Sequence, residues 1–298
     1  MVLGGLSVRR EEISGEGRLT LMCRILAISS AGGIPTEFAR SFRSLAETGN
    51  TIYGTYEETK SQGRPTGHRG GWGLAASRDG QWLGSPRISQ VDQDESLGDA
   101  SNPHSGYLET LEAFNILGPG VLIAHLRRPS EGDVCNLNTH PFSRNGYVFA
   151  HNGAVPWLTE EDGEAKAPSQ RNDSRVLFQR ILAAMAEGDS VENAVESVVS
   201  TIHRDGRNKT RPYSSLTSVL SDGKTLWVIR NVNPNKGSAA KRYYTMHLGK
   251  IADTPKVVVA CQEVLSYGSA AMEWKPMKEC ELAVIRDGAI VETRPLAQ

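Results

Sequence analysis

The stretch Met22-Cys23-Arg24-Ile25-Leu26-Ala27-Ile28 decides where the fold begins. The composition changes here to a short apolar run, which predicts a buried strand, although periodicity alone leaves a short helix open. The preceding residues, 1–22, carry charged side chains where an export signal would place its apolar segment, so they are not an export signal. We expect one domain over 23–298. Residues 1–22 are then a leader, a propeptide or, by preference, the product of a misassigned translation start.

The composition excludes several classes of protein. The chain has 298 residues, 39% of them hydrophobic and 22% charged, and a net charge of -1. A nucleic-acid-binding protein would show a basic excess, and a membrane-spanning helix needs roughly 18 or more consecutive apolar residues; the sequence has neither. The cysteines are scattered and lack the CxxC spacing of a zinc or redox site, which predicts a reducing, cytoplasmic environment. They are Cys23, Cys135, Cys261 and Cys280.

Elements further along the chain predict strands that pair through tight turns, with helices between them. Three pairs of apolar runs flank Asp-Gly turns: 72–76 with 81–83, 216–220 with 226–230, and 282–286 with 289–293. Helices are expected at 36–47, at 107–117 and at two places after 172, the second with an apolar stripe from Val191 to Ile202. Two more strands are expected at 121–125 and 147–151, and a loop at 49–71. This pattern favours an α+β layered fold over alternating βαβ units.

Cys23 is the first residue whose position indicates chemistry. On base rates a cysteine at the start of a strand is a small buried hydrophobe. Here it follows Met22, and cysteine is small enough for ordinary removal of an initiator methionine. Removal would leave a free α-amine, with an unperturbed pKa near 8, beside the thiol. We therefore predict an N-terminal nucleophile with its own general base.

Other residues are candidates for binding charge. Asn152 and Gly153 close a predicted strand and could supply a side-chain and a backbone N–H to an oxyanion, although Asn-Gly is also a strong turn signal. Arg127 follows another strand and could bind a carboxylate in bidentate fashion, the alternative being a surface ion pair. Asp173 could bind an α-ammonium group, the alternative being a helix N-cap.

The seven histidines show no metal-binding spacing, and no glycine-rich phosphate loop is visible, so neither a metal nor a cofactor is expected. His125 and His151 lie on expected core strands. Histidines in such places are more often hydrogen-bonded structural residues than ligands.

Six short motifs together resemble the class II glutamine amidotransferases, in particular their compact stand-alone branch. In chain order they are Met22-Cys23, Gly71-Trp72-Gly73, His125-Leu126-Arg127, Asn138-Thr139-His140-Pro141-Phe142, Ala150-His151-Asn152-Gly153 and Asn172-Asp173-Ser174. The resemblance implies an N-terminal-nucleophile hydrolase fold, a four-layer αββα sandwich of two antiparallel sheets between helical layers. Many relatives have Asp where this chain has Gly70, and Glu where it has Arg175.

The resemblance also implies roles for single residues. Cys23 would be the catalytic nucleophile, and Asn152 with Gly153 would bind the oxyanion. The substrate α-carboxylate would lie at Arg127, with Thr139 and His140 beside it, and the α-ammonium group at Asp173.

The expected activity is hydrolysis of the glutamine side-chain amide through a cysteinyl thioester. The ammonia would pass to an acceptor on a partner, such as a synthase subunit, because 23–298 leaves no room for a synthase domain. One alternative is a γ-glutamyl amide hydrolase that resembles the one in ergothioneine synthesis. Another is a non-catalytic binding or regulatory module that retains residues 1–22. A homodimer is left open.

Overall fold

The computed structural model describes most of the chain from Cys23 onward. The described residues are 23–64, 66–84, 87–89, 106–128, 138–161, 172–207, 212–252, 254–268 and 271–296.

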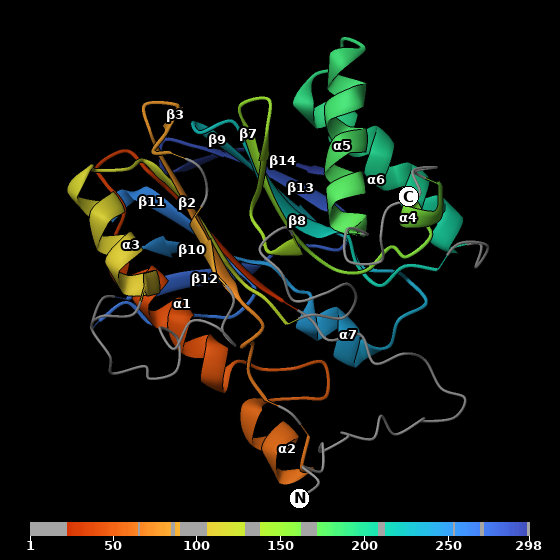
Figure 1. Cartoon of the computed structure of the whole chain (residues 1–298), viewed down its shortest axis with the longest axis horizontal. Helices are drawn as coiled ribbons and strands as arrows, with labels where there is room; N and C mark the ends of the chain where they lie inside the picture. The colour runs from red at the N-terminus through yellow and green to blue at the C-terminus, as the bar shows by residue number, and fades with distance from the viewer. Residues whose placement is uncertain are drawn as a thin grey trace, which may run out of the picture.

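Two antiparallel sheets form the centre of the described structure (Figure 1). The larger sheet runs in the order β12 (Met272–Pro276), β10 (His247–Ile251), β11 (Thr254–Cys261), β1 (Arg24–Ser30), β5 (Val121–Leu126), β2 (Trp72–Arg78) and β3 (Gln81–Trp82), with β4 (Arg87–Ser89) beside β2. The smaller sheet runs in the order β14 (Ala289–Pro295), β13 (Glu281–Arg286), β9 (Thr225–Arg230), β8 (Thr217–Ser221), β7 (Tyr147–Asn152) and β6 (Phe142–Arg144).

Helices cover the outer face of each sheet. Against the larger sheet lie α1 (Thr36–Thr48) and α3 (Gly106–Ile116). Against the smaller sheet lie α4 (Leu158–Glu161), α5 (Asp173–Ala186) and α6 (Val191–Arg207). Of two further short helices, α2 (Tyr56–Ser61) lies at the lower end of the molecule in the view of Figure 1, and α7 (Ser238–Tyr243) lies above it, below the smaller sheet. A third apolar cluster fills the space between the sheets, so the predicted four-layer αββα arrangement is confirmed.

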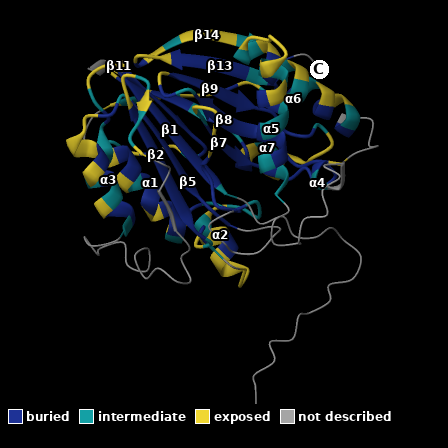
Figure 2. Cartoon of the chain, turned by 45° about the horizontal axis from the view of Figure 1, so that its top comes forward, coloured by how far each residue is buried: buried dark blue, intermediate teal, exposed yellow. Residues whose placement is uncertain are grey.

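Strand β1 is buried on both faces, which explains why its sequence is a continuous apolar run. Leu26 and Ile28 pack into the cluster under α1 and α3, whereas Ile25 and Ala27 pack between the sheets. Figure 2 shows the strands as the buried centre, and exposed residues on the helices and on β14. Because β1 has a neighbour on each side, its first residues are fixed in position.

The hairpin predictions are confirmed, and the turns explain why. Asp79 and Gly80 adopt φ angles of 53° and 81° between β2 and β3, as a tight two-residue turn requires. The predicted loop at 49–71 is wrong in part, because α2 lies within it. The Thr55 side chain and the Glu58 carboxylate form a capping box that starts this helix. No helix in the described residues is long and apolar enough to cross a membrane.

Candidate active site

Cys23 lies directly before β1 and is held by Asn152, the last residue of β7 in the opposite sheet. The Cys23 backbone N–H donates to Asn152 Oδ1 at 3.1 Å, and Asn152 Nδ2 donates to the Cys23 carbonyl at 2.7 Å. Asn152 is 1% exposed. In a chain that begins at Cys23, the same nitrogen would be the α-amine. The two sheets therefore meet at a reciprocal pair of hydrogen bonds between Cys23 and Asn152, which orients the backbone N–H and the carbonyl of the cysteine.

Two residues that the sequence did not indicate complete this arrangement. The Tyr243 hydroxyl, from α7, donates to the Cys23 carbonyl at 3.0 Å. Gln262 follows β11, and its Oε1 accepts from Asn152 Nδ2 and from the Ile25 N–H, both at 3.0 Å. No motif marks either residue, because each acts through one hydrogen-bonding group brought in from a distant part of the chain.

The thiol of Cys23 lies 3.9 Å from the Arg128 carbonyl oxygen and is partly buried. Desolvation raises the pKa of this thiol, while the backbone of Arg128 and the charges of Arg127 and Arg24 lower it and the charge of Asp173 raises it. Desolvation is the largest of these effects. Because the thiolate is the nucleophilic form, a nucleophilic Cys23 would need a base to remove its thiol proton.

Arg127 is 4% exposed, so the alternative of a surface ion pair is wrong. Its backbone N–H donates to the Gly71 carbonyl at 2.8 Å, and its carbonyl accepts from the Gly70 N–H at 2.8 Å. These bonds tie the end of β5 to the segment before β2. They help to hold Arg127, a buried cation, near Cys23, where its charge lowers the pKa of the thiol.

Asp173 is the first residue of α5, and the N-cap is Asn172, whose side chain accepts from the Arg175 N–H at 3.0 Å. The alternative that Asp173 is the N-cap is therefore wrong, because the residue before it has that role. The Asp173 carboxylate accepts from the N–H groups of Val155 at 2.5 Å and Ser174 at 2.7 Å. A carboxylate has about four acceptor positions, so it retains capacity for a ligand.

Gly153 follows Asn152 where the chain leaves β7. A Cβ there would lie 1.9 Å from the Ser215 carbonyl oxygen and 2.7 Å from His151 Nε2, so only glycine fits. No described strand pairs back from this point, because β7 pairs with β6 and β8, so the Asn-Gly turn signal does not mark a hairpin here.

Thr139 and His140 are both buried, on the segment that leads into β6. The His140 ring centroid lies 4.5 Å from that of His125 and 4.3 Å from that of Phe142. Burial lowers the pKa of His125 to about 3 and that of His140 well below its ordinary value, so both rings are neutral. A Cβ on Gly73 would lie 2.0 Å from the His140 carbonyl oxygen, so the glycine lets this segment pack against β2.

The expectation of a hydrogen-bonded structural histidine is confirmed for His151 and wrong for His125. The His151 ring contacts Ser174 Oγ at 2.8 Å and the Ser215 carbonyl oxygen at 3.0 Å. Neither ring nitrogen of His125 has a hydrogen-bond partner among the described residues. No group of three or more His, Cys, Asp or Glu side chains in the same residues could hold a metal ion.

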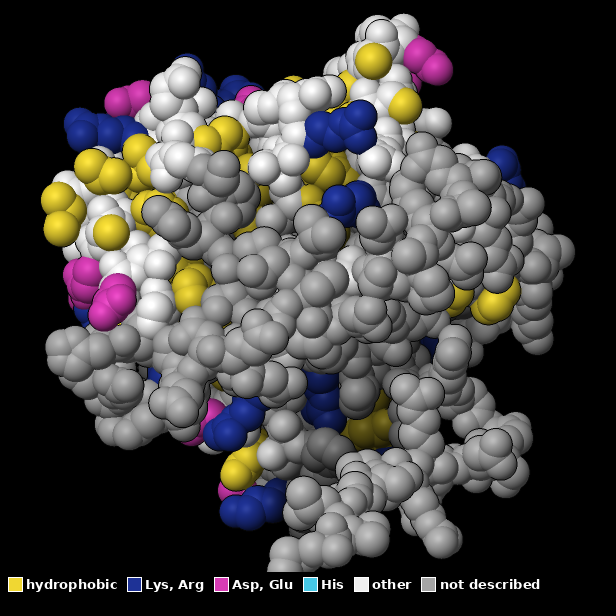
Figure 3. Space-filling view, in the orientation of Figure 1, with side chains coloured by type: hydrophobic (Ala, Val, Ile, Leu, Met, Phe, Trp, Pro, Cys, Tyr) yellow, Lys and Arg dark blue, Asp and Glu magenta, His cyan; other side chains and the backbone are white. Residues whose placement is uncertain are grey.

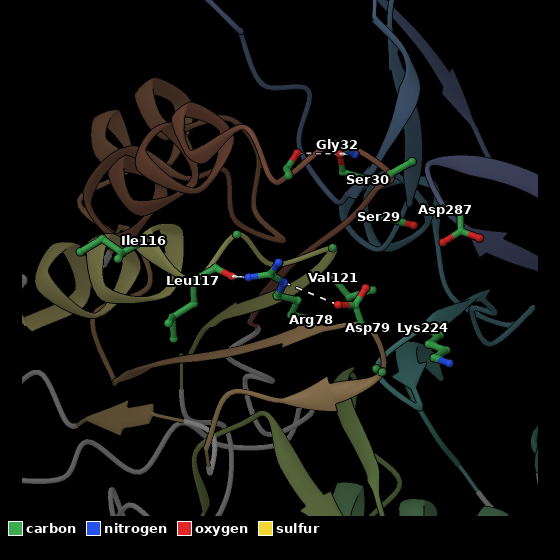
Figure 4. A pocket seen from close by; sticks show the side chains of 16 residues that line it. Ser29, Ser30, Gly32, Arg78, Asp79, Ile116, Leu117, Val121, Lys224 and Asp287 are labelled. Atoms are coloured by element: carbon green, nitrogen blue, oxygen red, sulfur yellow. Dashed lines mark hydrogen bonds and ion pairs between the residues drawn. The ribbon is translucent and has the colours of Figure 1, made fainter.

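A cavity of about 620 Å³ lies away from these residues, at the other end of β1 (Figure 4). Its lining includes Ser29, Arg78 and Lys224. Ser29 is six residues from Cys23 along an extended strand, a distance of about 20 Å. Figure 3 shows hydrophobic side chains at the surface near α3, whose final residue Ile116 is 84% exposed at this cavity. The cavity therefore does not belong to the candidate active site.

A sandwich of two antiparallel sheets between helices is the N-terminal-nucleophile hydrolase fold that the sequence predicts. Residues 22–298 match the family model described as glutamine amidotransferases class-II, and the chain belongs to that family. The predicted family is thereby confirmed.

Similar proteins agree with this assignment. The chain is 24% identical over 221 residues to a Haemophilus influenzae protein named "Putative glutamine amidotransferase", with 73% of this chain and 65% of that protein covered. The structure is similar to the allosteric regulatory enzyme of purine biosynthesis (TM-score 0.60, 15% identity), covering 92% of this chain and 49% of that one. It is also similar to a glutamine aminotransferase class-II domain protein from Silicibacter pomeroyi (TM-score 0.51, 16% identity), covering 93% and 100%. The chain thus spans about half of the purine enzyme and less than two thirds of the Haemophilus protein.

Proposed function

We propose that this protein hydrolyses the side-chain amide of glutamine, with Cys23 as an N-terminal nucleophile, and passes ammonia to an acceptor on a partner. The observation that carries the proposal is the reciprocal pair of Cys23 and Asn152. It orients the nitrogen that would become the α-amine, next to a thiol whose raised pKa calls for a base. An α-amine titrates near pH 8 and can take the thiol proton.

The proposed reaction proceeds in two steps. The Cys23 sulfur attacks the carboxamide carbon while its proton moves to the α-amine. As the C–N bond breaks, the α-amine returns the proton to the departing ammonia, which leaves a γ-glutamyl thioester. Water then adds to the thioester carbon, the C–S bond breaks, a proton from the water returns to the Cys23 sulfur, and glutamate is released.

Opposite charges beside Cys23 suit a free amino acid as the substrate. Arg127 and Asp173 both act electrostatically on the Cys23 thiol, and their effects on its pKa are opposite. In the proposal Arg127 binds the α-carboxylate, with Thr139 and His140 beside it, and Asp173 binds the α-ammonium group. A zwitterion would then compensate both charges at once.

The oxyanion would be bound by the Gly153 N–H and by the Asn152 amide. Asn152 Nδ2 now donates to the Cys23 carbonyl and to Gln262 Oε1. The proposal therefore requires one of these bonds to be exchanged when substrate binds, as is common in sites that tighten around the transition state.

Intact mass and labelling test the proposal together. The protein isolated from its native source should begin at Cys23, and a glutamine-mimicking diazoketone should add to the Cys23 thiol and stop ammonia release. A mature chain that retains a peptide bond before Cys23 would lack the base and exclude the mechanism. Comparing glutamine with larger γ-glutamyl compounds then separates a glutaminase from a γ-glutamyl amide hydrolase, since activity on the larger compounds alone would exclude the glutaminase.

A further inference from the structure

The carbonyl oxygen of Cys23 receives more hydrogen bonds than it has lone pairs. It accepts from Asn152 Nδ2 at 2.7 Å, from the Tyr243 hydroxyl at 3.0 Å and from Arg24 Nη1 at 3.5 Å. A carbonyl oxygen has two lone pairs, so two of these three donors are enough to satisfy it. The bond from Asn152 can therefore be released while the carbonyl keeps two donors.

The side-chain oxygen of Gln262 has no donor to spare. Its Oε1 accepts from the Ile25 N–H and from Asn152 Nδ2, both at 3.0 Å, which is one donor for each lone pair. Gln262 is 3% exposed, so water does not readily replace a donor that is lost there. Leaving a buried acceptor without a donor is destabilising. Of the two bonds that Asn152 Nδ2 makes, the bond to Gln262 is therefore the harder one to break.

A backbone group fixes the orientation of both side-chain amides. The Ile25 N–H can only donate, so the Gln262 atom that faces it is the oxygen and not the nitrogen. The same oxygen faces Asn152, which therefore presents Nδ2 to Gln262 and Oδ1 to the Cys23 nitrogen, 3.1 Å away. Reversing either amide would bring two donors or two acceptors face to face.

This orientation of Asn152 suits an α-amine that acts as a base. Oδ1 accepts an N–H from the Cys23 nitrogen, so the lone pair of a free amine would stay available for the thiol proton. In the reverse orientation Nδ2 would donate to that lone pair, and Oδ1 would face Gln262 Oε1. The Gln262 oxygen disfavours this reversal even when the bond to the Cys23 carbonyl has been released.

We infer that Gln262 is a positioning residue for the Asn152 amide. In the proposed reaction, the Asn152 N–H that now bonds the Cys23 carbonyl turns to the oxyanion, and Gln262 Oε1 retains the other N–H. Tyr243 and Arg24 continue to donate to the carbonyl. Gln262 thus acts through Asn152 and not on the substrate. The turn to the oxyanion rests on the proposed function, whereas the hold on the amide does not.

Two substitutions at Gln262 test the inference by ammonia release from glutamine. Gln262→Met keeps the length of the side chain and replaces the amide by a thioether, which is at most a weak acceptor. It should lower kcat about 10- to 100-fold, as expected for a catalytic group displaced by about 1 Å, and leave KM within about threefold. Gln262→Glu retains an acceptor oxygen in either protonation state and should keep kcat within about fivefold of the wild type.

Asn233→Leu is the matched control for the loss of a buried amide. Asn233 is 4% exposed, its Oδ1 accepts from the Asn235 N–H at 2.9 Å, and its Nδ2 donates to the Tyr213 carbonyl at 2.7 Å. The control should lose a free energy of unfolding in urea similar to that lost by Gln262→Met, and keep kcat within a few-fold. Equal losses of kcat in the two variants, or no recovery in Gln262→Glu, would show that Gln262 has no specific effect on catalysis.

The hold on Asn152 has a readout that needs no turnover, the hydrogen exchange of its side-chain N–H groups followed by NMR. In the wild type and in Gln262→Glu both N–H groups should exchange slowly. In Gln262→Met one of them should exchange about fivefold faster or more, as expected for loss of one hydrogen bond. Fast exchange of either group in the wild type, or no change in Gln262→Met, would refute the hold. A wild type that shows this exchange pattern and releases no ammonia would refute the proposed function alone.

Discussion

Replacing Asn152 with alanine removes three hydrogen bonds at the point where the two sheets meet. They are the bonds from the Cys23 N–H to Oδ1 and from Nδ2 to the Cys23 carbonyl and Gln262 Oε1. At about 1 kcal/mol each, their loss should lower the free energy of unfolding by about 3 kcal/mol. Because domains are stable by about 5–15 kcal/mol, Asn152→Ala should remain folded at 25 °C.

The effect on catalysis should exceed what unfolding can explain. Loss of one oxyanion donor typically lowers kcat about 10²–10³-fold. Unfolding free energy would be measured by urea denaturation followed by circular dichroism, and kcat by ammonia release from glutamine. The two quantities separate damage to the fold from damage to the site.

Asn231→Ala is the matched control. Asn231 is also 1% exposed and also makes three side-chain contacts, with Tyr213, His203 and Cys280. It should lose a similar free energy of unfolding and keep kcat within a few-fold of the wild type. If Asn152→Ala also keeps kcat within a few-fold, the assigned role of its amide is wrong, whatever the stability result.

Two further predictions concern charge. The thiolate of Cys23 is its reactive form, and the Arg127 charge lowers the pKa of the thiol, so Arg127→Gln should move the pH profile of Cys23 alkylation to higher pH. The profile is measured by mass spectrometry of the Cys23 peptide, and no shift, or a shift to lower pH, contradicts the electrostatic role of Arg127. Glu263→Ala leaves the buried Arg24 guanidinium without its carboxylate and should lower the free energy of unfolding, measured by urea denaturation, by about 3–5 kcal/mol. The control Glu292→Ala breaks a partly exposed ion pair and should lower it by less than about 1 kcal/mol. Equal losses would show that the Arg24 pair does not act as a buried one.

Much of the architecture follows from local patterns in the sequence. The apolar run after Cys23 predicted β1, the spacing of apolar residues predicted α1 and α6, and Asp-Gly turns predicted three hairpins. These features are set by the period of side-chain burial and by the φ angles that a turn requires, and both act over a few residues.

Other elements were not visible in the sequence. Helix α2 is only six residues long and starts from a capping box within a polar stretch, so apolar periodicity could not reveal it. Strands β10, β11 and β12 end the larger sheet without an Asp-Gly turn between them. Their pairing depends on the rest of the sheet being present.

The sequence by itself determined the family and the layered fold, and it predicted Cys23 and Asn152 as residues that would carry the chemistry. Each of these depends on a motif or a pattern that is local in the chain. Tertiary structure alone decided that Arg127 is buried, that Asn172 rather than Asp173 caps α5, and that Gln262 joins the site. The physical reason is distance along the chain: Gln262 reaches Asn152 across 110 residues and Ile25 across 237, and only the folded sheets bring those hydrogen-bonding groups within 3.0 Å.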